Sequence, residues 1–287
     1  MSSVDRALAS IRVVSAVRLG AHRRTAAGDR HAPDPQAPDR QRRQLLVIAG
    51  AETVDIEMGG KSYSIRPGQL AVLCPPPDEA LDLPSEGSDD GDGAVHIAFE
   101  SRGHVYTLLE RELPRVIVLE PTALLSSVSE LLREESSRGP LSSTLLCKLT
   151  EVAVCAAVND WVAAAPMPPG WIGGVAHPAI GATLEAVHSD LEGTWTVSDM
   201  AAHAHMSRSA FARVFREVVG STPSAHLARW RMAHALELLD AAPEMPLKEV
   251  AERLGYSDEF ALSTAFKRRF GASPRNYAAP APNRPRN

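Results

Sequence analysis

The first hundred residues carry short apolar runs that alternate partly with polar positions and are broken by Gly, Pro and Asp. Alternation with a period of two is typical of strands that bury one face. The pattern predicts strands at residues 11–19, 44–51, 53–58, 61–67, 69–75 and 94–100. Many short strands separated by turns favour a β-sandwich or a small barrel. Two polar stretches rich in Pro or Asp, residues 32–41 and 75–93, are predicted loops.

From Pro121 onward the apolar positions follow the spacing of helices. Residues 121–135 and 141–165 are predicted helices, and the second carries apolar side chains on more than one face. Such a helix is buried either wholly within its own subunit or partly against a second subunit. The Pro- and Gly-rich residues 166–174 have the composition of a linker. Beyond them the pattern is helical to about Tyr277.

The last hundred residues contain an imperfect repeat, in which residues 196–223 align with residues 246–274. Each copy has the pattern of a helix-turn-helix, with a small inward residue, a serine N-cap, and a second helix that ends at glycine and then proline. The matched pairs are Ala201 and Ala251, Ser207 and Ser257, and Gly220 and Gly271. The predicted buried stripes are Phe211, Phe215 and Val218, and Leu262, Phe266 and Phe270. Between the copies, residues 223–241 predict a long amphipathic helix.

A helix that buries one stripe can present the opposite stripe to the major groove of DNA. In the first copy the outward positions include Arg213, which can bond guanine through two donors, with Ser209 and Ala212 beside it. Arg208 and Arg216 lie nearer the edges and are expected to contact phosphate. The alternative is that these arginines form the solvated face of an ordinary helix pair. The recurrence of cap, glycine stop and proline in two copies favours DNA recognition.

Charge and composition change this picture little. The formal net charge of -5 argues against a nonspecific nucleic-acid coat. The segment from His177 onward is nearly neutral, so DNA binding must depend on where its charges cluster. No secretory signal or membrane-spanning apolar stretch is recognised, which predicts a cytoplasmic protein without a membrane partner.

The 3 cysteines are too few to indicate a disulfide framework. Cys147 and Cys155 lie about 12 Å apart along a predicted helix and are expected to fill the core. Cys74 precedes three prolines and is the candidate for an accessible, redox-active thiol. The histidines of the strand region lack metal-ligand spacing. We therefore expect no metal, no cofactor and no catalytic residue.

The helical part resembles the DNA-binding domain of the AraC/XylS family of transcriptional regulators. The matching runs are MSRSAFARVFREVVGSTP, RWRMAHALELL, EVAERLGYS and FKRRFGASPRNY. The resemblance implies a unit whose two helix-turn-helix motifs enter successive major-groove segments, and a variable N-terminal domain for effector sensing and dimerisation. The strand region, with IRPGQLAVLCP at its centre, resembles the cupin-type sensor of one branch of that family.

The expected fold class is α+β: a cupin-like β-barrel with following helices, then an all-α domain of two helix-turn-helix motifs joined by a long helix. The expected parts are a sensor domain at 1–118, a candidate dimerisation segment of helices at 119–165, a linker at 166–176, a DNA-binding domain at 177–279 and a disordered tail at 280–287.

The second copy departs from the family pattern, because Thr264 stands where the family often carries arginine. Asp258 and Glu259 suit the positive end of a helix but repel phosphate. Phe260 either faces the groove, where it can touch a thymine methyl, or has exchanged places with Leu262 in the core. The core exchange is the preferred interpretation of the two.

The expected base contacts are Ser209, Ala212, Arg213, Glu259, Phe260 and Thr264. The expected phosphate contacts are Arg208, Arg216, Lys267, Arg268, Arg269 and Arg275. The sequence thus predicts a sequence-specific regulator, an activator and homodimer, with double-stranded DNA, RNA polymerase and a small-molecule effector as partners. One alternative is a regulator in which Cys74 senses oxidants. A second is a metal-containing cupin enzyme with an accessory helical domain.

Overall fold

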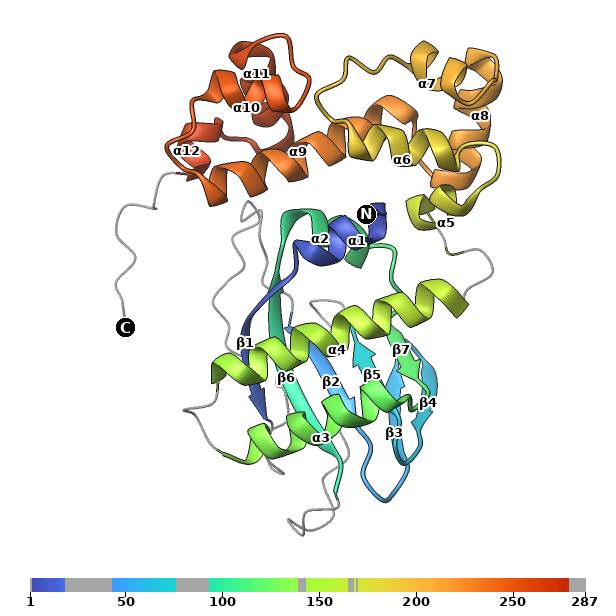
Figure 1. The fold of residues 1–287 in the computed structure, drawn as a ribbon, viewed down its shortest axis with the longest axis vertical. Helices are drawn as coiled ribbons and strands as arrows, with labels where there is room; N and C mark the ends of the chain where they lie inside the picture. Colours follow the sequence, from blue (N-terminus) through green and yellow to red (C-terminus); the bar gives the residue numbers. More distant parts are fainter. Residues whose placement is uncertain are drawn as a thin grey trace. The chain divides into compact units, whose positions relative to one another are not determined.

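The chain divides into two compact units in the computed structural model (Figure 1). We call them the sheet unit, Ile11–Arg102 with Leu113–Pro166, and the helical unit, Met1–Ser10 with Gly103–Glu112 and Met167–Asn287. The structure describes residues 2–18, 43–75, 93–138, 143–164, 168 and 170–278. The predicted loops at 32–41 and most of 75–93, and the predicted tail at 280–287, lie outside the described residues.

The described residues of the sheet unit form two antiparallel sheets. Its strands are β1 (Arg12–Arg18), β2 (Arg43–Ile48), β3 (Val54–Met58), β4 (Lys61–Ile65), β5 (Leu70–Leu73), β6 (Val95–Arg102) and β7 (Val116–Leu119). The larger sheet has the order β1-β6-β2-β5-β7, and β3 pairs with β4 in a separate hairpin. Within the described residues the larger sheet is open, with β1 and β7 at its edges, so the predicted closed barrel is not found.

The burial pattern of the strands follows their positions. β5 lies between β2 and β7 and is buried along its whole length. β3 alternates buried and exposed positions, as a strand with one solvent-exposed face does. The hairpin contributes Ile56 and Ile65 to a core that also contains Leu45 and Val47 of β2. The sequence pattern predicted six of the strands, but it missed the four-residue β7.

Two helices complete the sheet unit, α3 (Ala123–Ser137) and α4 (Ser143–Ala164). Figure 1 shows them crossing the sheet, and α4 packs against α3, β1 and β7. Thr122 caps α3 by accepting a hydrogen bond from the Leu125 backbone N–H. α4 buries Ala153, Val154, Ala157 and Val158 completely. Leu145 and Val152 of the same helix are nearly half exposed, so burial within the unit does not account for all of its apolar positions.

The helical unit is built from three separate stretches of chain. Its helices are α1 (Ser3–Ala9), α2 (His104–Glu110), α5 (Gly170–Ala176), α6 (Gly181–Ser189), α7 (Val197–His203), α8 (Arg208–Val219), α9 (Pro223–Ala241), α10 (Leu247–Arg253), α11 (Glu259–Phe270) and α12 (Pro274–Ala278). The long helix α9 has the predicted bounds. Residues 170–176, where the composition predicts a linker, instead form α5, with Trp171 and Ile172 buried.

The predicted sensor domain, residues 1–118, includes the segments that form α1 and α2. In the structure both helices pack in the helical unit. β1 and β6 pair at Arg12 and Arg102, so the residues just before β1 and just after β6 leave the sheet at the same end. The chain crosses itself closely there. A Cβ on Gly103 would lie 2.5 Å from the carbonyl oxygen of Ser10, and its φ of 143° favours glycine.

Candidate nucleic-acid interface

The first helix-turn-helix consists of α7 and α8, and both helices have side-chain caps. Thr196 and Asp199 form a capping box at the start of α7. Ser207 caps α8, as predicted, by accepting a hydrogen bond of 3.3 Å from the Ala210 backbone N–H. Gly220 ends α8 in the left-handed conformation, with a φ of 73°. The bounds of the first candidate reading helix are therefore set by residues visible in the sequence.

The second helix-turn-helix consists of α10 and α11. Its cap is Asp258, whose carboxylate accepts a hydrogen bond of 2.7 Å from the Ala261 backbone N–H. The prediction that Ser257 fills this position is therefore wrong by one residue. The second copy is one residue longer than the first, and the extra residue lies in the turn between Tyr256 and Asp258, so the cap shifts by one position. Gly271 ends α11 at a φ of 76°, as predicted.

The turns of the two motifs share a backbone hydrogen bond. The Met206 N–H donates to the Ala201 carbonyl in the first copy, and the Tyr256 N–H donates to the Ala251 carbonyl in the second, both at 2.9 Å. The residues before them, His205 and Gly255, both have positive φ, 54° and 65°. The repeat in the sequence is thus a repeat in the backbone.

Each motif buries one stripe of its second helix. Phe211 and Phe215 are almost wholly buried, and Val219 completes the first stripe in place of the predicted Val218. Leu262 and Phe266 are fully buried in the second motif. Phe260 is 75% exposed, so the preferred interpretation that it exchanges into the core is wrong. It lies two residues before Leu262, which places it on a different side of the helix.

The polar side chains of α8 face away from its buried stripe. Ser209, Arg208, Arg213 and Arg216 are exposed, and Ala212 is partly buried. Arg213 forms an ion pair of 3.2 Å with Glu217, one turn further along the helix. An exposed pair of this kind is worth about 0.3–0.5 kcal/mol, so a stronger partner can replace it. The sequence analysis did not single out Glu217, although its spacing of four from Arg213 is the signal for such a pair.

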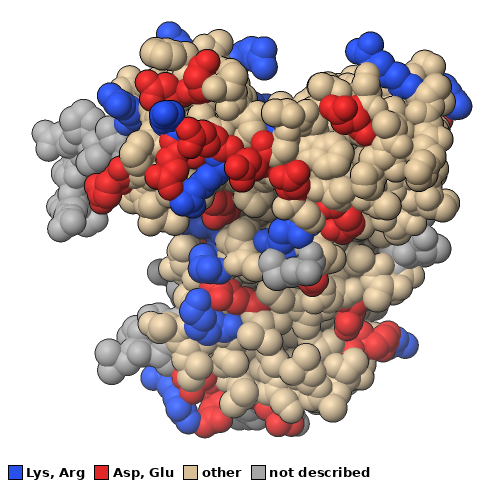
Figure 2. Space-filling model, turned by 45° about the horizontal axis from the view of Figure 1, so that its top comes forward, with Lys and Arg blue, Asp and Glu red and all other residues tan. Residues whose placement is uncertain are grey.

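Charge is distributed unevenly over the helical unit. Figure 2 shows basic side chains along the edge at its α7–α8 end, and acidic side chains mixed with basic ones toward its α10–α12 end. The net charge of the two motifs is nevertheless equal: residues 196–220 contain three basic and two acidic residues, and residues 246–271 contain five basic and four acidic residues. Three of the cations of the second motif, Lys267, Arg268 and Arg269, occupy the last turn of α11. Cations are also favoured at this position because the C-terminal end of a helix carries a partial negative charge.

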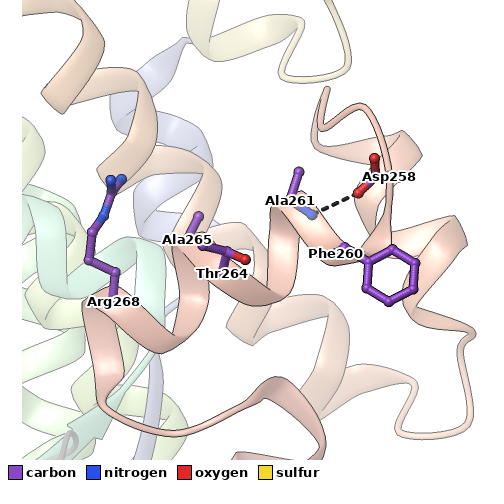
Figure 3. Close-up of a pocket in the computed structure, with 6 residues that line it drawn as sticks. All are labelled: Asp258, Phe260, Ala261, Thr264, Ala265 and Arg268. Atoms are coloured by element: carbon purple, nitrogen blue, oxygen red, sulfur yellow. Dashed lines mark hydrogen bonds between the residues drawn. The ribbon is translucent and has the colours of Figure 1, made fainter.

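The exposed face of α11 has a shallow hollow lined by Asp258, Phe260, Ala261, Thr264, Ala265 and Arg268. Figure 3 shows Phe260 at one end of this face and Arg268 at the other, with Thr264 between them. Their spacing of four places all three on one side of the helix. Glu259 is partly buried, and Lys267 and Arg275 are exposed. Arg269 follows the buried Phe266 by three residues, so it lies on the side of α11 nearer the buried stripe, away from the exposed face that carries Thr264.

The long helix α9 connects the two motifs. Arg231 of α9 lies over the Tyr256 ring, with its guanidinium carbon 5.6 Å from the ring centroid, and donates 2.6 Å to the Gly193 carbonyl. Burial lowers the pKa of Arg231 and raises that of Tyr256. A Cβ on Gly255 would lie 2.3 Å from the Arg231 guanidinium. It would also lie 2.7 Å from the backbone carbonyl oxygen of Glu192, and the φ of 65° favours glycine, so the second turn needs glycine at this position.

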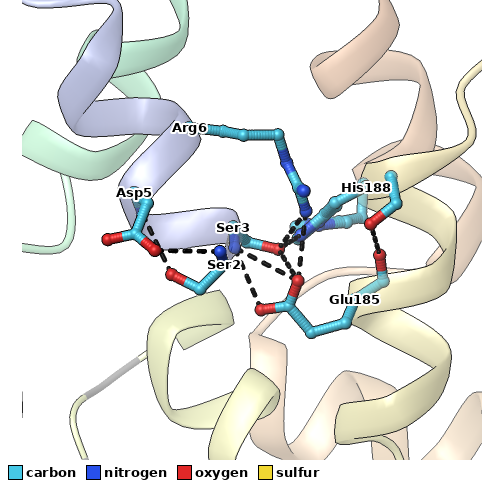
Figure 4. Close-up of polar contacts among 8 residues, drawn as sticks. Ser2, Ser3, Asp5, Arg6, Glu185 and His188 are labelled. Carbon is cyan, nitrogen blue, oxygen red and sulfur yellow. Dashed lines mark hydrogen bonds and ion pairs between the residues drawn. The ribbon is translucent and has the colours of Figure 1, made fainter.

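Behind the first motif, α1 docks on α6 through one carboxylate (Figure 4). The Ser3 hydroxyl donates 2.8 Å to Glu185, the Ser3 backbone N–H donates 3.0 Å to the same group, and Arg6 pairs with it at 3.1 Å. Ser2 caps α1 in a capping box with Asp5. The hydrophobic residues Val4, Ala7 and Leu8 of α1 are buried. Sequence reasoning missed this contact because its partners lie 182 residues apart.

A buried cluster of aromatic rings continues from this contact toward α9. The Ser3 hydroxyl and His188 Nδ1 lie 2.7 Å apart, and His188 Nε2 lies 2.7 Å from His226 Nε2. Trp230 stacks on His188 with ring centroids 3.8 Å apart. Burial holds the pKa of His188 well below its usual range and lowers the pKa of His226 to about 3. These rings are thus neutral packing elements near neutral pH.

The features behind the alternative functions lie in the sheet unit. Cys74 is partly buried, and Gln44 Nε2 approaches its Sγ at 3.7 Å. Burial raises the pKa of Cys147 and Cys155, which disfavours their thiolates. In the part of the chain that the structure describes, no cluster of three or more His, Cys, Asp or Glu side chains is arranged to hold a metal ion. Among the same residues, no helix combines the length and apolarity that crossing a membrane requires.

Comparison with known proteins gives consistent matches. A model of the helix-turn-helix domain matches residues 200–279. The chain is 34% identical over 254 residues to a putative AraC-like transcription regulator of Streptomyces antibioticus, covering 81% of this chain and 82% of that protein. It is 31% identical over 212 residues to the HTH-type transcriptional regulator AlkR of Acinetobacter baylyi, covering 70% and 67%. It is 28% identical over 228 residues to the RCS-specific HTH-type transcriptional activator RclR of Escherichia coli, covering 76% and 78%.

Proposed function

The chain belongs to the AraC-like family of DNA-binding transcription regulators, and from this premise we propose that α8 and α11 enter successive segments of the major groove. The observation that carries the proposal is the pair of matched motifs. Each has a capped second helix with one buried and one exposed stripe, and α9 connects both. A fixed connection between two reading helices allows them to bind one face of a duplex together.

Within this proposal Arg213 reads a base, with Ser209 and Ala212 next to it. Arg213 is exposed near the middle of α8, and the weak pair with Glu217 can be exchanged for guanine. On α11, Phe260, Thr264 and Glu259 lie over bases. The phosphate-binding group comprises Arg208, Arg216, Lys267, Arg268, Arg269 and Arg275, all of which are exposed. Arg269 is the least well placed of these, since it lies on the side of α11 nearer the buried stripe.

Arg213→Ala should weaken binding to the selected site by about 5- to 150-fold, which corresponds to 1–3 kcal/mol. The physical reason is loss of a two-donor contact, so discrimination at one base pair should relax while other positions keep their preferences. Selection of bound sequences from a random DNA pool, followed by titration of single base-pair changes, measures both effects. Equal weakening on every sequence would show that Arg213 does not read a base.

Lys267→Ala is the matched control for a phosphate contact. It should weaken binding by a similar factor on all sequences and reduce the slope of log affinity against log salt by about one contact. Base preferences should not change. If the unmodified protein enriches no sequence motif at moderate salt, the proposed function itself is wrong.

We propose that the sheet unit binds a small-molecule effector and forms a homodimer through α3 and α4. Family membership supports the effector and RNA polymerase as partners, and the name of one relative, RCS-specific, ties that relative to a signal. A surface feature supports the dimer. Leu124 and Leu131 of α3 are 59% and 47% exposed, and Leu145 and Val152 of α4 are 49% and 45% exposed. The members of each pair lie seven residues, about two turns, apart.

Combined substitution Leu131→Glu and Leu145→Glu should convert the dimer to a monomer, because two charges would be buried at the interface without partners. Sedimentation equilibrium measures the change, and the far-ultraviolet circular dichroism spectrum checks that the fold is kept. Phe260→Ser is the control, since it removes an even more exposed apolar side chain, 75% exposed, from the other unit. A monomeric unmodified protein, or an unaffected dimer, contradicts this assignment of the interface.

A further inference from the structure

Phe260 is the most exposed large apolar side chain of the described residues, at 75%. It lies near the start of α11 and borders the hollow along the exposed face of this helix (Figure 3). The core beneath is already filled, because Leu262 and Phe266 are fully buried. Phe260 therefore has no place in the packing of its own motif, and a large exposed apolar group of this kind is typical of a contact site.

The neighbours of Phe260 offer few hydrogen-bond donors. Ala261 and Thr264 line the same hollow, and both present a methyl group. The Asp258 carboxylate is already held by the Ala261 backbone N–H at 2.7 Å and lies 3.3 Å from the Ser257 hydroxyl. The cation of this face, Arg268, follows Phe260 by eight residues, about 12 Å along the axis. The entry half of the face is thus suited to apolar contact, and its far half to an anion.

We propose that α11 selects thymine by its C5 methyl group, with Phe260, Ala261 and Thr264 in contact with it, while Lys267 and Arg268 hold the neighbouring phosphates. The inference rests on the proposed DNA-binding function and names what the second motif reads. Thymine is the base that presents a methyl group in the major groove. A bidentate guanine contact needs an arginine or lysine in the middle of the face, and Thr264 stands there.

The acidic residues at the start of α11 indicate that Phe260 contacts the edges of bases and not phosphates. Asp258 and Glu259 would be repelled by a phosphate but can lie over the amino groups that cytosine and adenine present in the groove. A protein partner is the other class of occupant for an exposed phenylalanine. DNA is favoured because Lys267 and Arg268 are both exposed in the last turn of α11, where they can bind phosphates next to the bases.

The test replaces thymine by deoxyuridine, one position at a time, in the sequence selected by the full-length protein. This change removes only the methyl group. We expect one or two positions in the α11 half-site to bind about fourfold more weakly per methyl lost, as for other buried apolar groups of that size. In the half-site read by α8, deoxyuridine should be tolerated at thymines next to the guanine that Arg213 contacts, because that contact does not involve a methyl group.

Two variants link the effect to the proposed residues. Phe260→Ser should bind the thymine site more weakly and should no longer distinguish thymine from deoxyuridine at the affected position. Thr264→Ser keeps the hydroxyl but loses the methyl, so it should reduce the distinction by a smaller factor. Both residues are exposed, so neither variant is expected to alter folding.

The outcomes separate this inference from the proposed function. Sequence-specific binding in which every deoxyuridine is tolerated overturns methyl recognition and leaves the proposed function intact. Absence of any sequence preference overturns both. If Phe260→Ser keeps its affinity and base preferences but loses activation in transcription reconstituted with RNA polymerase, the face binds a protein, and the assignment to thymine is wrong.

Discussion

Lowering the pH from about 7 to about 4 should remove several kcal/mol from the free energy of unfolding of the helical unit. The cause is the buried pair His188 and His226, together with the partly buried His234. The His234 ring stacks on Trp230 with centroids 5.9 Å apart. Burial lowers the pKa of His226 to about 3 and that of His234 to about 4, from an ordinary value of 6.5. Below pH 6.5 the unfolded chain takes up protons that the folded unit cannot accept. Stability should therefore be level above pH 6.5 and decline between 6.5 and about 3.

The geometry of the cluster explains why protonation is unfavourable. The two Nε2 atoms of His188 and His226 are 2.7 Å apart, so they can share one proton but cannot both carry one. His226 Nδ1 has no hydrogen-bond partner within the described residues. Arg6 and Arg229 further disfavour positive charge there. Glu185 is the nearby acidic group, and it is already engaged by Ser3 and Arg6.

Urea unfolding followed by tryptophan fluorescence between pH 8 and 4 measures the effect, and Trp230, stacked on His188, reports on the cluster. His226→Gln cannot gain a charge in this range and should flatten part of the pH dependence. His205→Asn is the control, because His205 is exposed and its positive φ is tolerated by asparagine. A stability profile that is the same in His226→Gln and the unmodified protein contradicts the role of the cluster.

Deleting residues 1–10 should lower the free energy of unfolding of the helical unit by about 3–6 kcal/mol. The estimate counts the buried side chains of Val4 and Leu8, at about 1.5–3 kcal/mol each. The deletion also leaves Glu185 without Ser3 and Arg6, and His188 without the Ser3 hydroxyl (Figure 4). DNA affinity should fall with stability, although α1 contains none of the proposed DNA contacts.

A graded series of variants separates this contact from general damage. Glu185→Ala should cost about 1–3 kcal/mol, since it strands partly buried donors but keeps the apolar packing of α1. Glu244→Ala removes an exposed carboxylate from the same unit and should change stability by less than about 0.5 kcal/mol. Equal urea midpoints for the deletion variant and the unmodified protein would mean that α1 does not stabilise the unit.

The sequence predicted the two motifs well because their determinants are local. The caps, the left-handed glycines and the spacing of Phe211 and Phe215 all act within one or two turns of helix. The errors in this region are also local. The cap is Asp258 and not the predicted Ser257, and the first buried stripe ends at Val219 and not at the predicted Val218. The exposure of Phe260 was decided by Leu262, which already fills the core position.

The remaining differences arise where structure depends on distant partners. α1 is a helix of seven residues, too short to be stable alone, and its partner Glu185 is far away in the sequence. β7 is four residues long and is fixed by pairing with β5. Strand order cannot be read from alternation, which specifies faces but not neighbours. This is why a barrel was expected and an open sheet was found among the described residues.

The contact between Ser3 and Glu185 also has a consequence for synthesis on the ribosome. The two residues are 182 positions apart. At about 5–20 residues per second, roughly 9–36 s pass between the translation of Ser3 and that of its partner. During this time the nascent chain carries Val4, Ala7 and Leu8 without the surface that buries them. We therefore expect the helical unit to fold late, after most of the chain has been made, with α1 a binding site for chaperones until then.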